Sequence, residues 1–179
     1  TDPDAAAYWL QRMVEAGEDP LFILRRMVIF ASEDIGHADP QALQIAMSAT
    51  HAFRFVGMPE GMYSLMQAAT YLATAPKSNT ILRTIKSAKN AVAAHGNLPV
   101  PLHLRNAHTR LDRALGHGRD YVYPHDQPDH HSGKSCLPDG LETLTLFAPN
   151  EQGLETQFKA RLDALRANSS APPSDRSEP

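Results

Sequence analysis

The first forty residues contain three aspartate–proline pairs, which begin at Asp2, Asp19 and Asp39. Aspartate is a favoured N-cap, because its carboxylate accepts hydrogen bonds from the free N–H groups of the first helical turn. Proline is tolerated at the first helical position, where no backbone donor is needed. The distance between successive pairs fits one helix plus one loop. The pairs therefore predict a succession of short helices.

Apolar residues between these starts recur every three or four positions, as in amphipathic helices. Glycines near the expected helix ends agree with this interpretation. Along the last of these helices, Ile81, Ile85, Ala88 and Val92 are expected to face the core. Short loops favour antiparallel neighbours, so residues 1–95 are predicted to form a helical bundle. The expected helices cover residues 3–16, 20–34, 40–56, 59–74 and 77–95.

Residues 96–167 are predicted to be an extended, loop-rich excursion with closing helices that pack on the bundle in the same domain. We expect an extended stretch over 96–106, helices over 107–115 and 151–166, and a small β pairing of 121–123 with 144–147. Residues 168–179 have almost nothing to bury and are predicted to be disordered. The expected fold class is all-α.

Length and composition narrow the possible classes of protein. A chain of 179 residues buries a sufficient core without disulfides or metal. The single cysteine, Cys136, excludes an internal disulfide framework and a cysteine-rich zinc site, and it favours a reducing compartment. No apolar run is long enough for a transmembrane helix. The chain starts at Thr1 without a signal segment, so we expect it to be one region of a longer protein.

Catalytic motifs are missing from the sequence. It contains no GxxxxGK[ST] phosphate loop, GxGxxG, HExxH or GxSxG, so no catalytic or cofactor-binding residue is assigned. Cys136 is interpreted as a loop thiol rather than a nucleophile.

A histidine- and aspartate-rich stretch over residues 117–131 holds the types of side chain that bind divalent metals. It contains His117, His125, Asp126, Asp129, His130 and His131. No pair has the i, i+4 spacing of a helix-borne site, so capping and surface roles are favoured and no metal ligand is assigned. A metal-dependent hydrolase is the least favoured hypothesis.

The charge distribution singles out the middle of the chain. Residues 61–119 carry eight basic and one acidic side chain, a local charge of +7, between flanks of −5 each. Such a segment fits nucleic acid phosphates, acidic surfaces of neighbouring subunits, or a solvated helix face. The candidate DNA or subunit contacts are Lys77, Arg83, Lys86, Lys89, Arg105, Arg110, Arg113 and Arg119.

Several runs resemble a known family. They are DPDAAAYWLQRMVEAGEDPLFILRRM, FASEDIGHADPQALQIA, YLATAPKSNT, LPVPLHLRNAHTRL and GHGRDYVYPHD. In this order they are similar to the C-terminal part of the replication-associated recombination protein A family, also called MgsA or RarA, from about Asp2 to Leu162. The chain departs from the family pattern at His108, His130, His131 and Cys136, and its tail after Arg166 finds no match.

The resemblance implies the C-terminal region of an AAA+ ATPase of the clamp-loader clade. Its fold would be helical and related to the clamp-loader collar, and it would assemble subunits into a homotetramer. ATP and magnesium would bind an N-terminal module that is absent from this sequence, so the fragment itself is expected to be neither an enzyme nor a cofactor binder.

The resemblance also implies a place of action. The family works in DNA replication, recombination and repair at stalled forks, in the cytoplasm with the nucleoid. Its expected partners are single-stranded or forked DNA and single-strand DNA-binding protein. The alternative function for this fragment is direct DNA binding through the basic segment 77–119.

Overall fold

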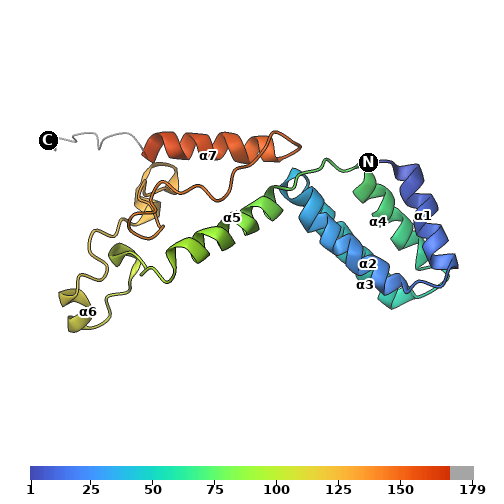
Figure 1. Cartoon of the computed structure of the whole chain (residues 1–179), viewed down its shortest axis with the longest axis horizontal. Helices are drawn as coiled ribbons and strands as arrows, with labels where there is room; N and C mark the ends of the chain where they lie inside the picture. The colour runs from blue at the N-terminus through green and yellow to red at the C-terminus, as the bar shows by residue number, and fades with distance from the viewer. Residues whose placement is uncertain (170–179) are drawn as a thin grey trace. The chain divides into compact units, whose positions relative to one another are not determined.

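The computed structural model describes residues 1–169, and every regular element within them is helical (Figure 1). The all-α prediction is confirmed. None of these helices is both long and apolar enough to cross a membrane. The α-helices are α1 (Pro3–Glu15), α2 (Pro20–Phe30), α3 (Gln41–Val56), α4 (Met62–Thr74), α5 (Thr80–His95), α6 (Arg110–Ala114) and α7 (Glu155–Ser169).

The chain forms two compact units. The first, which we call the bundle unit, comprises residues 1–87 and 147–159, and the second comprises the described residues 88–146 and 160–169. Helices α5 and α7 each begin in the bundle unit and end in the second unit. The disorder predicted for residues 168–179 falls mostly on residues 170–179, which lie outside the described residues.

The first two aspartate–proline pairs begin helices as predicted, whereas at the third pair Pro40 is the N-cap and α3 starts one residue later. Asp2 Oδ1 accepts from the Ala5 N–H at 2.9 Å, and Asp19 Oδ1 accepts from the Leu21 N–H at 2.9 Å. Both carboxylate oxygens of Asp39 accept hydrogen bonds: Oδ1 from the Gln41 N–H at 3.1 Å and Oδ2 from the Tyr71 hydroxyl at 2.7 Å. This bond to a carboxylate raises the pKa of Tyr71, since it favours the protonated phenol.

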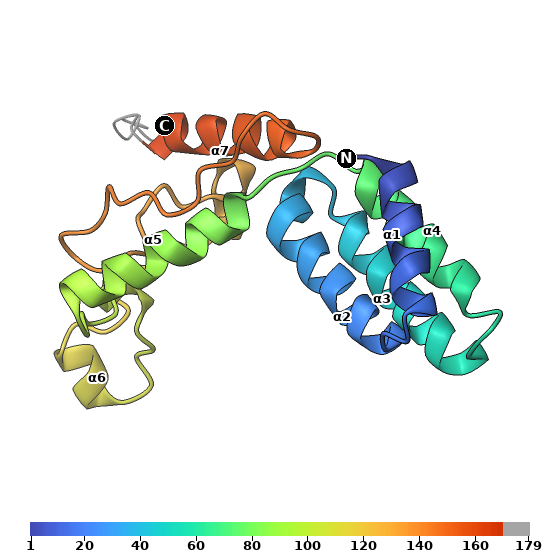
Figure 2. The ribbon, with the colours of Figure 1, turned by 45° about the vertical axis from the view of Figure 1, so that its right-hand side comes forward.

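Helices α1 to α4 pack side by side (Figure 2), with α4 in contact with α1, α2 and α3. One core cluster centres on Leu24 and Leu65, both fully buried. A second centres on Ile35 and is lined by alanines that allow close helix approach. Residues 31–34 were predicted to continue α2 but belong to a π-helical turn, η1 (Ala31–Ile35), followed by the 3-10 turn η2 (Gly36–Ala38).

Residues 147–159 close the bundle unit far from α1 to α4 in sequence. The Leu154 N–H donates to the Ala38 carbonyl at 2.9 Å. Gly153 has φ of +52°, and a Cβ there would lie 2.1 Å from the Ala38 oxygen. Only glycine fits this position, because the backbone conformation and the close approach both exclude a side chain.

The second unit is irregular, as predicted, but its expected β pairing is wrong. Residues 121–123 and 144–147 form no strand within the described chain. The segment instead consists of loops and three 3-10 turns, η3 (Leu102–Leu104), η4 (Pro124–Asp126) and η5 (Pro128–His130). The short helix predicted over 107–115 is α6, which starts with a reciprocal capping box between Thr109 and Asp112.

The Asp19 cap is expected to contribute measurably to stability. Asp19→Ala removes the acceptor at the start of α2 and is expected to cost about 0.5–2 kcal/mol, seen as a lower denaturant midpoint with an unchanged slope. Asp19→Asn is the matched control, since asparagine also caps well. Equal midpoints for the alanine variant and the wild type would show that this cap contributes nothing.

Candidate interaction surfaces

A buried polar cluster fixes the start of α5. Glu155, the first residue of α7, is fully buried. Its Oε1 accepts from the Ser78 hydroxyl at 2.7 Å and its Oε2 accepts from the Thr80 hydroxyl at 2.9 Å. The two hydroxyls come from the end of the α4–α5 connection and the first residue of α5, more than seventy residues away in sequence.

Further donors complete the cluster. The Asn150 N–H donates to Glu155 Oε2 at 2.7 Å, and its side-chain amide donates to Ser78 Oγ at 3.0 Å. Arg83 donates to the Thr80 hydroxyl oxygen at 3.1 Å, and is thus linked to the Glu155 carboxylate through Thr80. A buried carboxylate is tolerated only where hydrogen bonds replace its lost water, and these donors do so.

Lys77 acts as a cap within the protein. Its Nζ donates to the carbonyl of Leu72 at 2.9 Å, to that of Ala73 at 3.3 Å, and to that of Ala75. These carbonyls end α4, where a positive charge is favourable. Burial lowers the pKa of Lys77 because the ammonium loses water, and nearby Asp34 acts in the opposite direction. Its role in this turn therefore needs no partner molecule.

The other candidate contact residues are divided between the two units. Arg83 and Lys86 lie on the part of α5 that belongs to the bundle unit, and Lys89 lies three residues further along the same helix. All three side chains are exposed. Their spacing of three residues offsets neighbours by about 60° around the helix, so they fan across a broad surface.

Within the second unit the remaining four arginines have different surroundings. Arg105 is half-buried, and its Nε donates to the Val100 carbonyl at 2.7 Å. Arg110 and Arg113 are exposed on α6, and Arg119 is exposed in the turn that follows it. Lys77, Arg83 and Arg105 make the side-chain hydrogen bonds described above. For the other five candidate residues, no side-chain ion pair or hydrogen bond is found within residues 1–169.

The histidine- and aspartate-rich stretch shows ring contacts. His125 packs against Tyr123 and His130, with ring centroids 5.1 Å apart in both pairs. His117 lies 3.7 Å from an Asp112 oxygen. Across the described residues, no three histidine, cysteine, aspartate or glutamate side chains come together in a way that could hold a metal ion.

The apolar side of α5 differs from the prediction. Ile85 is 50% exposed and Val92 is 66% exposed, although both were expected to face the core. The helical periodicity is correct, but these two side chains are left half or more exposed. Helix amphipathicity shows which side is apolar and does not show what covers it.

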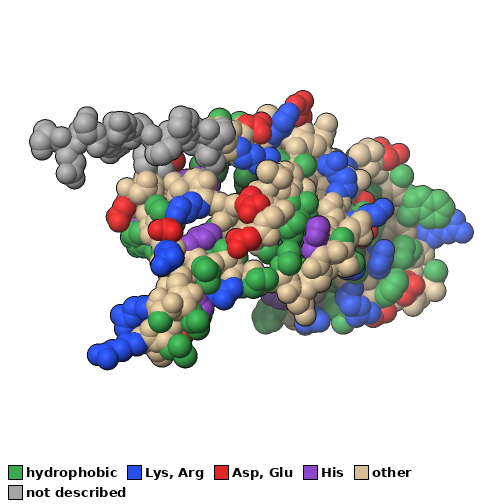
Figure 3. All heavy atoms as spheres, turned by 60° about the vertical axis from the view of Figure 1, so that its left-hand side comes forward, with side chains coloured by type: hydrophobic (Ala, Val, Ile, Leu, Met, Phe, Trp, Pro, Cys, Tyr) green, Lys and Arg blue, Asp and Glu red, His purple; other side chains and the backbone are tan. Residues whose placement is uncertain are grey.

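A second exposed apolar surface lies at the corner between α3 and α4, which we call the α3–α4 corner (residues 55–63). Phe55 is 92% exposed and Tyr63 is 81% exposed, the two highest values among the large apolar side chains described. Val56 and Met58 between them are about half exposed. Apolar side chains are also seen at the surface among lysines and arginines in Figure 3. Exposed patches of this kind mark sites of contact with other molecules.

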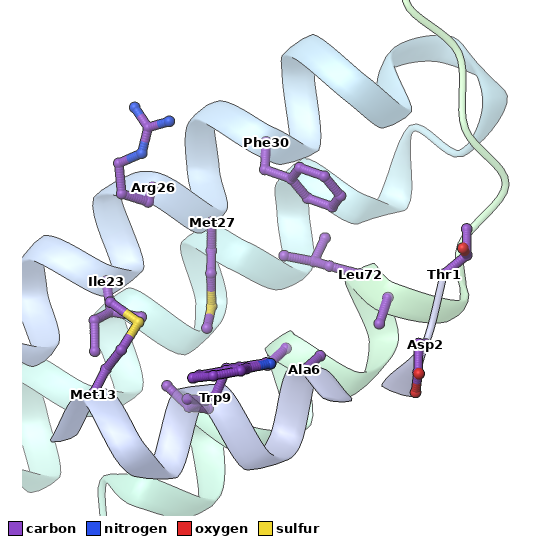
Figure 4. Close-up of a pocket in the computed structure, with 13 residues that line it drawn as sticks. Thr1, Asp2, Ala6, Trp9, Met13, Ile23, Arg26, Met27, Phe30 and Leu72 are labelled. Carbon is purple, nitrogen blue, oxygen red and sulfur yellow. The ribbon is translucent and has the colours of Figure 1, made fainter. Parts of the chain in front are cut away.

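The bundle unit also has an apolar groove between α1, α2 and α4, which we call the α1–α2 groove (Figure 4). Its volume is about 410 Å³. Trp9 on α1 faces Met27, Phe30 and Leu72 across it. Asp2 lies at one end of the groove, and the Arg26 side chain at its rim points outward.

Sequence reasoning missed the Glu155 cluster, the exposed α3–α4 corner and the α1–α2 groove. No local signal connects Glu155 with Ser78, because the pairing is long-range. Phe55 lies next to the apolar periodic positions Phe53 and Val56, and the sequence does not show which of these side chains the fold covers. The Thr109–Asp112 capping box was also missed, although it has a local signature, the spacing T-x-x-D.

Comparison with known proteins identifies the family to which this chain belongs. The family model described as "MgsA AAA+ ATPase C terminal" matches residues 1–166. The chain is 44% identical over 167 residues to replication-associated recombination protein A of Coxiella burnetii, covering 93% of this chain and 38% of that protein. It is 42% identical over 165 residues to the Haemophilus influenzae protein of the same name, covering 92% and 37%.

A third relative, replication-associated recombination protein A of Escherichia coli K12, is 40% identical over 161 residues, with 89% and 36% covered. The chain belongs to the family of MgsA AAA+ ATPase C-terminal regions. It spans less than two-fifths of the length of these curated relatives.

The Glu155 carboxylate is expected to be essential for the bundle unit. Glu155→Ala leaves the Ser78 and Thr80 hydroxyls and the Asn150 N–H without their acceptor, at about 1–3 kcal/mol for each buried group left unpaired. The measurement is the free energy of unfolding in denaturant. The matched control is Glu151→Ala, which removes an exposed glutamate paired with Lys159 and should leave the free energy of unfolding almost unchanged. Equal losses for the two variants would contradict the structural role of Glu155.

Proposed function

We propose that this chain is the self-association region of an AAA+ ATPase that acts in replication-associated recombination. The observation that supports it is the amount of apolar surface left exposed on well-formed helices, at α5 and at the α3–α4 corner. Family membership supplies the biological setting, since several relatives carry the name replication-associated recombination protein A. The expected assembly is a homotetramer.

The ATPase activity is proposed for a part of the protein outside these 179 residues. The sequence contains no phosphate loop, and its described residues form a helical region with exposed apolar surfaces. ATP and magnesium would then bind the AAA+ module, and this region would hold several modules together. We place the whole protein in the cytoplasm at the nucleoid, with DNA and single-strand DNA-binding protein as partners.

A second candidate function is direct DNA binding. It is favoured by the exposed basic side chains of α5, α6 and the following turn, which make no ion pair within residues 1–169. Lysines and arginines of this kind neutralise phosphates and release counterions. The two functions are compatible, because the apolar surfaces and the basic side chains are different groups.

Self-association is tested on the chain itself. Light scattering across the micromolar range is expected to give a mass that is a multiple of the 19.6 kDa monomer. The double variant Ile85→Gln/Val92→Gln tests whether the α5 face contributes, with Asn90→Gln as a control on an exposed polar position of the same helix that is not a candidate contact. A strictly monomeric wild-type chain at every concentration would refute the proposal.

The role of the basic side chains is tested with a triple variant, Arg83→Gln/Lys86→Gln/Lys89→Gln. If they contact DNA, affinity should fall for every sequence, and the slope of log K against log salt should flatten by up to about three phosphate contacts. Arg25→Gln, a bundle arginine outside the segment, is the control. If the side chains contact acidic neighbours, the triple variant should loosen the oligomer and leave DNA binding per subunit alone. A variant that changes neither property would show an ordinary solvated surface.

A further inference from the structure

We propose that the α3–α4 corner of one copy inserts into the α1–α2 groove of a second copy, so that the chain assembles head to tail. The proposal rests on the proposed self-association and names the two surfaces that carry it. The inserted side chain is Phe55, and Trp9 forms one wall of its receptor. Both surfaces belong to the bundle unit, so each copy carries one of each.

The first argument is the mismatch between each surface and water. Phe55 is 92% exposed, and its corner also exposes Tyr63, Val56 and Met58. The groove is apolar along most of its lining and leaves Trp9 54% exposed. An aromatic side chain removes about 150–250 Å² from water when it is buried, and buried aromatic anchors dominate the energy of protein interfaces. A groove of about 410 Å³ has room for such a ring.

The second argument is that one copy cannot use its own corner to fill its own groove. The corner adjoins the start of α4, whereas the groove is lined by Ala69, Leu72 and Ala73 near the end of that helix. Six to ten residues of helix separate Tyr63 from these lining residues, which is about 9–15 Å at 1.5 Å per residue. A contact between different surfaces of identical copies is heterologous, and it closes into a ring when the rotation between copies allows.

The third argument is charge. Exposed Arg54 precedes Phe55 at the edge of the corner, and exposed Glu60 lies within it before Tyr63. The groove carries Asp2 at one end and Arg26 at its rim (Figure 4). Each charge of the corner thus has an opposite charge beside the groove, and complementary rims of this kind fix the orientation of a contact.

The decisive experiment is a mixing test on the full chain. Phe55→Asp destroys the inserted side chain, and Trp9→Glu puts a charge into the receptor wall. Each variant alone is expected to run as a 19.6 kDa monomer in light scattering. An equimolar mixture is expected to give a heterodimer of twice that mass, because the intact groove of the first variant accepts the intact Phe55 of the second. A symmetric contact of like surfaces cannot be rescued in this way.

Two controls protect the interpretation. Phe22→Asp replaces another exposed phenylalanine of the bundle, outside both surfaces, and should leave assembly unchanged. Thermal unfolding followed by circular dichroism establishes that the variants fold. The charge swap gives an independent readout: Glu60→Arg should weaken assembly about tenfold, the equivalent of about 1.4 kcal/mol, and Glu60→Arg/Arg26→Glu in the same chain should restore it.

The outcomes separate this inference from the proposed function. An oligomeric wild type whose Phe55→Asp variant stays oligomeric overturns the corner-and-groove contact and keeps self-association. The contact is equally overturned if both variants are monomeric but fail to complement each other. A monomeric wild type overturns both proposals. Complementation together with charge rescue supports the contact.

Discussion

The Glu155 carboxylate holds together the parts of the bundle unit that are far apart in sequence. It brings the first turn of α7 against the start of α5, and its two oxygens accept from Ser78, Thr80 and Asn150. A fully buried anion is costly unless its hydrogen bonds are complete. Completeness of the cluster therefore fixes the start of α5, and with it the line along which the exposed side chains of α5 are presented. The bond from Arg83 to the Thr80 hydroxyl connects this interior to the basic surface.

The helical elements were largely predictable because their signals are local. An aspartate followed by proline predicts a helix start from neighbouring residues alone, and Asp2 and Asp19 do cap the predicted helices. The predicted continuation of α2 failed at η1, where the backbone widens into a π turn before Gly36 without any change in hydrophobic pattern. The β pairing failed for a similar reason. Residues 121–123 and 144–147 were expected to pair, and nothing in the sequence shows whether the fold brings two such short segments side by side.

The candidate contact residues show the limit of counting charges. Lys77, Lys86 and Lys89 belong to the same basic segment. The ammonium of Lys77 caps α4, whereas the side chains of Lys86 and Lys89 are exposed to solvent. Charge is a property of the residue, whereas availability depends on the carbonyls and hydroxyls that the fold places nearby. The same distinction holds for apolar side chains. Ile85 and Leu65 both occupy apolar helix positions, and only the structure shows that one is half exposed and the other fully buried.

Exposed apolar side chains are tolerated on a folded chain only where another surface covers them or where their cost is small. Phe55 is an extreme case, because its side chain is 92% exposed and almost none of its apolar surface is buried by its own chain. The groove beside Trp9 has the opposite defect, since it is apolar and incompletely filled. Each defect is removed by the other when two copies meet, and neither can be removed within one copy, because α4 holds the two surfaces apart. A rigid helix that separates an exposed aromatic side chain from an apolar groove favours assembly over self-closure, and the rotation between neighbours then decides the number of copies in the ring.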